Sequence, residues 1–214
     1  MATIFIANVG VNSYDASARG MMSPIFPDRK FEFIPIKEPA RITGVNIPRY
    51  SDLRCVNQQA KISLYLPERV RQYCAHDDPE FITFTYGDVT RWSRGSNLQW
   101  LQPGDFLFFL ARLVPWQDGN FSANKGGFYL IGYLEVNRIF QEEGEISEYS
   151  ALLANNAHFK RYQNGQEKIG DFRIIKGNPK SSKRFSHAIT LDKTFCTRFL
   201  RDKYGNEFDW QDGK

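Results

Sequence analysis

Two long apolar stretches constrain the fold of this chain more than any other feature. They are DFLFFLARLV at residues 105–114 and GFYLIGYLEV at 127–136. The first follows a Pro-Gly turn signal and begins apolar on both faces, which predicts a strand in the interior of a sheet. The second contains Gly132, which indicates a bulge or a bend of the kind that small barrels use. The predicted strands are 3–8, 30–36, 81–86, 105–114, 127–140, 171–176 and, with a weaker pattern, 185–191.

Helical patterns are fewer and do not alternate regularly with the strands. We expect helices at 66–74, 147–162 and 192–205, the second with Ser147 as its N-cap. This order favours an α+β fold, a PUA-like curled, mostly antiparallel β-sheet or pseudobarrel with flanking helices. A chain of 214 residues fits one large domain, so residues 1–214 are predicted as a single unit that ends in a C-terminal helix and tail at 191–214.

Composition excludes several classes of protein. The three cysteines include no CxxC pair and the three histidines no HxxxH pair, so we expect reduced thiols, no metal and no cofactor. The N-terminus lacks a signal-peptide pattern, and FLFFLA at 106–111 is far shorter than the roughly 20 residues of a membrane span. We therefore expect a cytoplasmic protein without a membrane partner.

Charge and aromatic content leave a polyanionic ligand open. The net charge of +4 permits such a partner without requiring one. Aromatic residues make up 15% of the chain, so most rings belong to a core and a few are candidates for stacking on a ligand.

A long polar segment, ANVGVNSYDASARGMMSPIF at 7–26, separates the first two predicted strands. Compact domains join such strands with about two to six residues, and longer ordered loops are often functional. The segment holds Asn8, Asn12, Tyr14 and Ser23, whose amides and hydroxyls suit hydrogen bonding to the edge of a nucleobase. The alternative is that these groups only satisfy the backbone of the loop.

Several stretches between about residues 4 and 191 together resemble a known family. They are ANVGVN with SPIFPDRKFEFIPI, TYGDVTR, LQPGDFLFFLARLVPW, GGFYLIGYLEV, NAHFKR and IIKGNPKSSKRFSHAITL. The layout resembles the nucleotide-modification-associated domain families, the third of them most, and is similar to the wider PUA-like group of EVE, ASCH and YTH modules. The resemblance implies a pseudobarrel whose cleft accepts a modified nucleobase, sometimes flipped out of a duplex, in DNA modification or phage defence. Relatives include readers and enzymes, so the fold alone does not settle the function.

Asp88 and His158 are the candidate catalytic residues. Asp88 follows Tyr86 at the end of a predicted strand, and a carboxylate beside the sugar can activate water or stabilise an oxocarbenium ion in glycosidic cleavage. A turn or N-cap role is the alternative for Asp88. A histidine such as His158 suits acid–base catalysis near neutral pH, although a histidine near a helix end often serves packing or the helix dipole.

Further candidates are expected to line a base pocket or to contact phosphates. Tyr86, Arg112, Trp116 and Asn156 are predicted beside the base, with Trp116 either a pocket wall or a cap on the core. The basic loop KGNPKSSKR at 176–184 suits DNA phosphates and lacks the order of a P-loop, and a solvated loop is its alternative. The predicted phosphate-binding residues are Arg161, Lys176, Lys180, Lys183 and Arg184.

These residues lead to three hypotheses. The first is an enzyme that recognises a modified, flipped-out base in DNA and removes it as an N-glycosidase. The second is a reader that binds such a base and catalyses nothing. The third is a PUA-like RNA-binding module. We favour the first, with DNA that carries modified bases as the partner.

Overall fold

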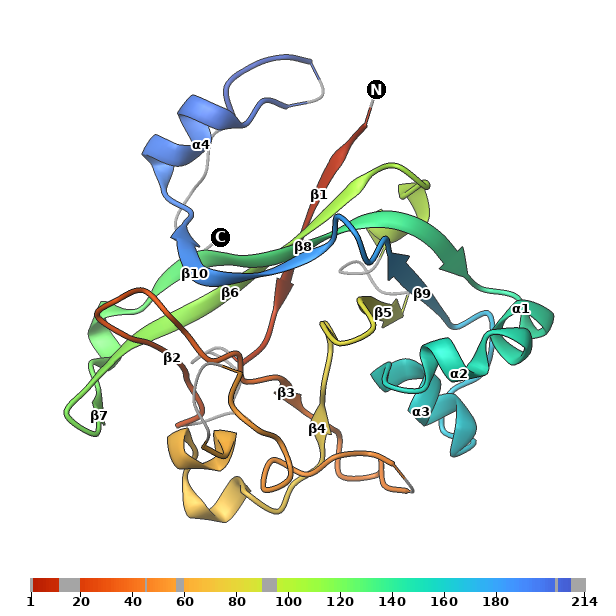
Figure 1. The fold of residues 1–214 in the computed structure, drawn as a ribbon, viewed down its shortest axis with the longest axis horizontal. Helices are drawn as coiled ribbons and strands as arrows, with labels where there is room; N and C mark the ends of the chain where they lie inside the picture. The colour runs from red at the N-terminus through yellow and green to blue at the C-terminus, as the bar shows by residue number, and fades with distance from the viewer. Residues whose placement is uncertain are drawn as a thin grey trace.

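Two long strands form the centre of the sheet in the computed structural model of this chain (Figure 1). They are β6 (Phe106–Gln117) and β8 (Gly127–Phe140), which pair antiparallel and confirm the two apolar stretches as central strands. Their side chains are mostly buried or half-buried because other elements cover the hairpin. The residues that the structure describes are 2–11, 20–44, 46–56, 60–89, 96–202 and 204–208.

The edge of β6 that faces away from β8 is lined by two parallel strands. β1 (Ile4–Val9) runs beside the first half of β6, and β2 (Ser23–Ile25) runs beside the second half. A short strand, β7 (Asn120–Phe121), folds back onto the end of β6. The polar segment at 7–26 therefore contains a strand, β2, that the sequence pattern did not predict.

The opposite edge, on β8, carries β10 (Lys183–Thr190) and β9 (Phe172–Gly177), both antiparallel to β8, and β5 (Thr85–Val89) pairs with β9. In the described part of the chain these eight strands form one mixed sheet, whose main path runs β1-β6-β8-β9-β5.

The α+β class is confirmed, whereas a closed or strongly curled sheet is not found. The outermost strands β1 and β5 do not pair with each other among the described residues, so the sheet stays open. The expected pseudobarrel is therefore corrected to an open, mixed sheet. The physical reason is that irregular chain, rather than further strands, packs beside the sheet.

Gly132 lies at a bulge in β8, as predicted. The register between β8 and β6 shifts beside it, which leaves Ile131 as the extra residue. A Cβ atom at Gly132 would lie 2.6 Å from the backbone oxygen of Lys183 and 2.8 Å from the Phe81 ring. The missing side chain therefore lets β10 and this ring approach the strand.

The strand predicted at 30–36 is instead an extended, buried segment. Ile34 donates its backbone N–H to Ser23 Oγ at 3.0 Å, and Phe31 forms an isolated bridge with Ile25. Pro35 has no N–H to offer to a ladder. Hydrogen bonds of this segment therefore go to single partners, although its apolar side chains enter the core as a strand's would.

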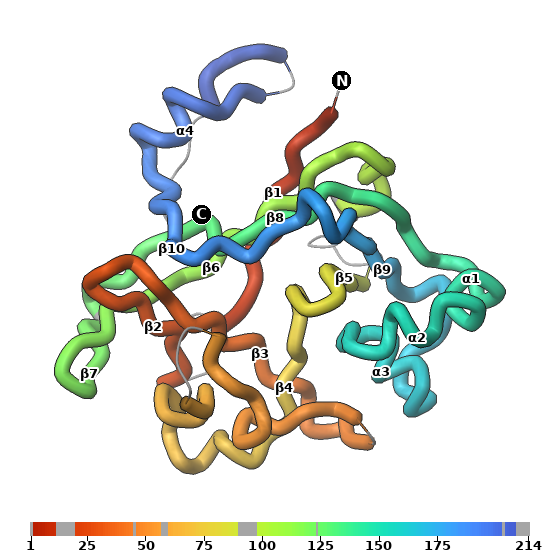
Figure 2. Tube along the Cα trace, viewed as in Figure 1, coloured from red at the N-terminus to blue at the C-terminus, as the bar shows by residue number. Residues whose placement is uncertain are grey.

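The chain between β2 and β5 forms a layer without long elements on one side of the sheet (Figure 2). It contains a small ladder of β3 (Ile36–Lys37) and β4 (Ala75–His76). A second group of buried apolar side chains, around Tyr50 and Tyr65, stabilises this layer, and Met21 joins the group from the chain before β2. The result places Glu38, directly after β3, beside the end of β4.

The helix predicted to begin at Ser147 is replaced by three short helices. They are α1 (Glu143–Glu148), α2 (Ser150–Leu153) and α3 (Ala157–Gln163), so Ser147 lies inside α1. Asn156 is the N-cap of α3, so the helical segment before it cannot continue into α3. Apolar side chains of these helices pack against β9 and the end of β8.

The two other predicted helices are shorter than expected. α4 (Lys193–Phe199) covers the first part of 192–205, and Asp192 caps its start. The pattern at 66–74 folds only into a 3₁₀ turn, Glu68–Val70. Within the part of the chain that the structure describes, no helix is both long and apolar enough to cross a membrane. Further 3₁₀ turns among the described residues are Ile62–Tyr65, Ser96–Trp100 and Ala123–Lys125.

Candidate functional site

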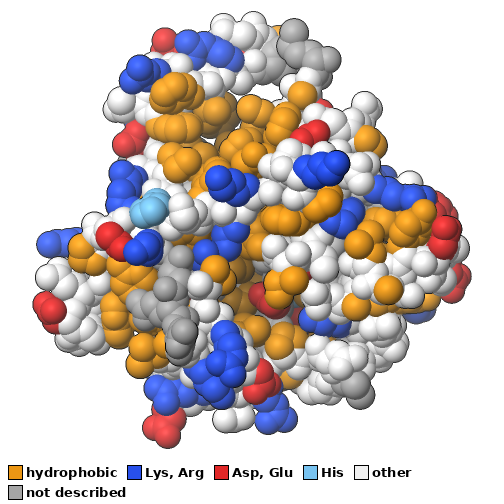
Figure 3. Space-filling model, viewed as in Figure 1, with side chains coloured by type: hydrophobic (Ala, Val, Ile, Leu, Met, Phe, Trp, Pro, Cys, Tyr) orange, Lys and Arg blue, Asp and Glu red, His pale blue; other side chains and the backbone are white. Residues whose placement is uncertain are grey.

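A pocket of about 400 Å³ lies between β1 and the segment that follows α4. Most of its lining residues are apolar, although nearly half of the wall surface is polar, and Figure 3 shows hydrophobic side chains gathered between α4 and the sheet. This volume falls within the range of small-ligand pockets. The lining residues are Ile4, Phe5, Ile6, Ala7, Tyr86, Asp88, Leu98, Leu107, Phe199, Leu200, Arg201 and Phe208.

Tyr86 and Asp88 form a polar end of this pocket. Both point to the same face of β5, because side chains alternate along a strand. The Tyr86 hydroxyl donates to Asp88 Oδ2 at 3.1 Å, and the Val89 N–H donates to Asp88 Oδ1 at 2.7 Å. Burial and the nearby Asp88 charge raise the pKa of Tyr86 well above its ordinary value. The hydroxyl therefore keeps its proton and orients a half-buried carboxylate at the pocket wall.

The opposite face of β5 meets α3 at Gly87. A Cβ atom there would lie 2.6 Å from Cδ2 of His158 and 3.2 Å from Oδ1 of Asn156. The Gly87 N–H also donates to Asp78 Oδ2 at 2.7 Å. One strand therefore separates the pocket from a second group of polar side chains.

This second group, the buried cluster, contains two histidine–glutamate pairs. His76 Nδ1 lies 2.9 Å from Glu38 Oε1, and His158 Nδ1 lies 2.7 Å from Glu167 Oε2. Arg161 joins the pairs, since its Nε donates to Glu38 at 3.0 Å and its Nη1 to Glu167 at 2.8 Å. A carboxylate at Nδ1 requires the proton on that nitrogen, which leaves Nε2 of each neutral ring as an acceptor.

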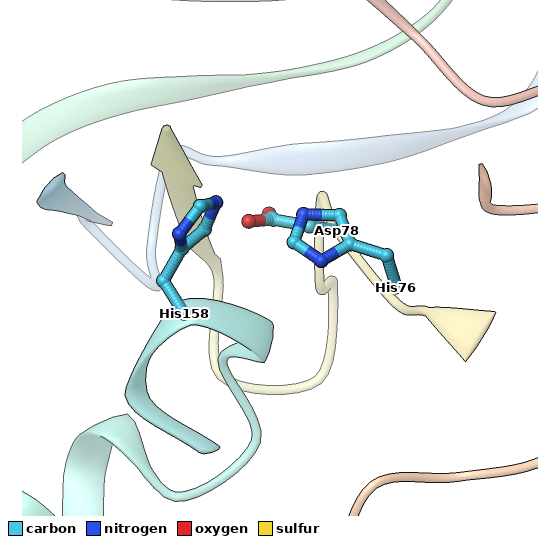
Figure 4. Close-up of side chains that lie close together, drawn as sticks. All are labelled: His76, Asp78 and His158. Atoms are coloured by element: carbon cyan, nitrogen blue, oxygen red, sulfur yellow. The ribbon is translucent and has the colours of Figure 1, made fainter. Parts of the chain in front are cut away.

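The two imidazole rings meet edge to face with their centroids 4.9 Å apart, and Asp78 lies beside them, with the Nε2 side of each ring turned toward its carboxylate (Figure 4). The ligand atoms of His76, Asp78 and His158 all lie within 4.8 Å of one another. All three residues are buried, and Asp78 is only 4% exposed. Its Oδ1 has no hydrogen-bond partner in the described part of the chain. A buried polar oxygen without a partner is energetically unfavourable, and most buried polar atoms in proteins do have one.

Burial dominates the electrostatics of the cluster. It lowers the pKa of His76 to about 4, although Glu38 opposes this shift, so the ring is neutral at neutral pH. Burial also raises the pKa of Asp78 well above its ordinary value. For Glu38, burial is outweighed by hydrogen bonds and charges from His76 and Arg161, so the pKa falls and the carboxylate stays ionised. The cluster therefore holds a neutral His76 ring against the ionised carboxylate of Glu38.

Local structure places these side chains. His76 ends β4, whose partner strand β3 leads directly to Glu38. The Asn156 side chain accepts backbone N–H groups of the first turn of α3 at 3.0 and 3.2 Å, which fixes the turn that carries His158. Arg161 lies three residues later, on the same side of the helix.

Five of the predicted site residues fall into these two places. Tyr86 and Asp88 share the pocket. His158 and Arg161 belong to the buried cluster, and Asn156 caps the helix that carries them. The guanidinium of Arg161 is engaged by two glutamates instead of being presented to a phosphate. The two candidate catalytic residues, Asp88 and His158, therefore lie on opposite faces of β5.

The other predicted base-binding residues are not brought together. Asn8 is exposed on β1 and does not line the pocket, and Arg112 is half-buried in β6. Ser23 is buried, where its hydroxyl accepts a backbone N–H at 3.0 Å. Trp116 packs against two aromatic rings with centroids 4.6 and 5.2 Å away and lines a separate pocket of about 320 Å³. Asn12 and Tyr14 lie outside the described residues.

The predicted phosphate-binding residues of the basic loop divide into exposed and internal side chains. Lys180 and Lys183 are exposed in and beside the turn between β9 and β10. Lys176 is only 6% exposed, and its ammonium donates to two backbone oxygens. Arg184 donates to the backbone oxygen of Phe31 at 3.1 Å and lies over that ring. The exposed lysines remain directed to solvent, where a phosphate can reach them.

The sequence alone did not indicate several residues that line the pocket or belong to the buried cluster. Phe199 and Arg201 reach the pocket from the end of the chain, and their pattern indicates only a helix. The expectation of no metal depended on the lack of paired histidine motifs. The one local signal was the spacing of His76 and Asp78, and their partner His158 comes from a distant helix.

Comparison with known proteins places the chain in a family. Searches of curated proteins and of solved structures found no significant match. The family model described as nucleotide modification associated domain 3 matches residues 3–199, which include the whole buried cluster and most of the pocket lining. Because the match spans nearly the full length, the chain belongs to the nucleotide modification associated domain 3 (Nmad3) family.

Proposed function

We propose that this chain binds a modified base, flipped out of DNA, in the pocket beside β5 and removes it by hydrolysis of the N-glycosidic bond. The observation that carries the proposal is the hydrogen-bonded Tyr86–Asp88 pair in the wall of a pocket of about 400 Å³ whose other lining residues are, except for Arg201, apolar. Membership of a family associated with nucleotide modification supports a nucleotide substrate.

The walls of the pocket suit a flat base. Phe5, Phe199 and Phe208 contribute aromatic surface, and stacking on such rings returns about 1–3 kcal/mol per base. This offsets the few kcal/mol needed to take a base out of the duplex. Arg201 adds a cation to the lining, which suits the phosphate next to a flipped nucleotide.

Asp88 is the candidate catalytic residue. In the proposed reaction the C1′–N bond breaks, a water oxygen bonds to C1′, and the departing base takes the bonding electrons and a proton from that water. The Asp88 carboxylate first accepts this proton from the attacking water and then returns it to the departing base. The same carboxylate stabilises the positive charge that develops on the sugar. Tyr86 is a positioning residue, because its hydroxyl holds Asp88 Oδ2 at 3.1 Å.

The test uses the purified full chain with heavily modified phage DNA and with unmodified DNA. We expect alkali-labile abasic sites and released base from the modified DNA alone. Asp88→Asn should lower the rate by about 100-fold or more while DNA binding is retained. Asp118→Asn is the matched control, since it neutralises an exposed carboxylate at a turn that does not line the pocket.

Other outcomes assign a different function. Binding of modified DNA with neither abasic sites nor released base leaves a non-catalytic reader. Preference for structured RNA over DNA favours an RNA-binding module. An equal loss of activity in Asp118→Asn and Asp88→Asn removes the catalytic role from Asp88.

A further inference from the structure

We propose that His76, Asp78 and His158 bind a divalent first-row transition-metal ion. The site does not depend on the base pocket, from which β5 separates it. Its ligand atoms come from the end of β4, from the turn after it and from the first turn of α3, and they lie within 4.8 Å of one another.

The donor set is one that such ions prefer. Two imidazole nitrogens and one carboxylate oxygen form the combination found in mononuclear iron sites, and three protein ligands plus water are typical of catalytic zinc. Ligating histidines usually give their other N–H to a carboxylate, which fixes the ring and its tautomer. Here Glu38 and Glu167 do this for both rings, at 2.9 and 2.7 Å.

The unpartnered oxygen of Asp78 is an independent observation that points to a ligand. Asp78 is 4% exposed, and its Oδ1 has no hydrogen-bond partner among the described residues. The atoms turned toward this carboxylate, the Nε2 atoms of His76 and His158, are acceptors as well. A cation coordinated by these three atoms supplies the partner that Asp78 Oδ1 otherwise lacks.

The geometry also indicates how the ion is held. With metal–ligand bonds of about 2.1 Å, two atoms bound to one ion are at most about 4.2 Å apart, and the three ligand atoms here lie within 4.8 Å of one another. Gly87 supports the carboxylate, since its N–H donates to Asp78 Oδ2 at 2.7 Å. Three protein ligands leave coordination positions open for water or a substrate oxygen.

The experiment titrates the full chain, purified without a polyhistidine tag and stripped with a chelator. We expect one Zn²⁺ or Co²⁺ per chain by calorimetry, visible ligand-field bands with Co²⁺, and no binding of Mg²⁺, which prefers oxygen ligands. Absence of a one-to-one complex in folded wild-type protein overturns the proposal, as does binding of Mg²⁺ equal to that of Zn²⁺.

Variants assign the ion to these residues. Asp78→Asn and His158→Gln should abolish the Co²⁺ bands, whereas His187→Gln removes an exposed histidine and should leave them unchanged. Because the first two lie in the interior, Glu167→Gln provides a milder test and should weaken affinity about 10- to 100-fold. Unchanged Co²⁺ bands and affinity in Glu167→Gln and either ligand variant would assign the ion elsewhere. Circular dichroism of each metal-free variant shows that it is folded.

Discussion

The amide of Asn156, predicted beside a base, is fully buried at the start of α3. It accepts two backbone N–H groups and its nitrogen lies 3.4 Å from Thr85 Oγ1. Lys176 and Ser23 likewise direct their polar groups to backbone partners. Residue type therefore predicts hydrogen-bonding capacity, whereas the position in the fold decides whether a ligand or the chain itself uses it.

Asn156→Ala should lower the free energy of unfolding by about 2–3 kcal/mol. The change removes a helix cap and leaves buried backbone N–H groups without an acceptor. Urea denaturation measures the loss, with Asn120→Ala, at the exposed first residue of β7, as the control that stays within about 0.5 kcal/mol of wild type. Equal stability of the two variants would show that the cap contributes little.

The three cysteines should differ sharply in reactivity. Burial, with the Glu32 charge, raises the pKa of Cys55 to about 11, and Cys196 is fully buried, whereas Cys74 is half-buried. Because the thiolate is the reactive form, native protein at pH 8 should show a single fast thiol in a colorimetric titration. We expect Cys74→Ser to remove this fast phase, and denaturant to release all three thiols of the wild type. A fast phase that survives in Cys74→Ser contradicts the assignment.

Elements with a strong, continuous pattern form as predicted, and those with mixed signals do not. The apolar stretches at 105–114 and 127–140 become the central hairpin. The segment at 30–36 alternates like a strand, but its backbone finds a serine hydroxyl and single bridges instead of a ladder. The helix predicted at 147–162 is interrupted because Asn156 is a better cap than a helix interior residue.

The bulge of β8 gives an element-scale prediction. Gly132→Ala should destabilise the protein by about 1–3 kcal/mol, because the backbone oxygen of Lys183, 2.6 Å from the new Cβ, has little room to move. Gly144→Ala is the matched control, since nothing lies within 4 Å of its Cβ and helix α1 gains by about 0.5 kcal/mol. Urea denaturation should therefore give changes of opposite sign, and changes of the same sign would argue against crowding at the bulge.

At the scale of the whole molecule, an open sheet places two chemically different regions on the faces of one strand. The pocket with Tyr86 and Asp88 lies on one face of β5, and the buried cluster around Asp78 lies on the other. Gly87 permits this arrangement, because any side chain there would collide with His158. Neither the pocket nor the buried cluster requires a closed barrel.

The distribution of charge over the molecule predicts how DNA binding responds to salt. Replacing the exposed Lys180 and Lys183 together by Ala should reduce the slope of log affinity against log salt by about 2, because each phosphate contact contributes roughly 0.9. The control is Lys168→Ala with Lys193→Ala, two exposed lysines outside the loop, which changes net charge equally. A fluorescence titration over a series of salt concentrations measures the DNA affinity of both double variants. Equal slopes for the loop variant and the control variant would exclude a specific role of the loop.

The sequence by itself determined the α+β class, the central hairpin, the bulge at Gly132 and the family, because these depend on periodicity, turn residues and local motifs. It also indicated Tyr86 and Asp88 as candidate site residues, and the structure places both on one face of β5. Only the tertiary structure decided that the sheet stays open and that His158 meets His76 and Asp78. The reason is that contacts between distant segments follow from how layers pack, and no local pattern in the chain encodes which buried polar groups will face one another.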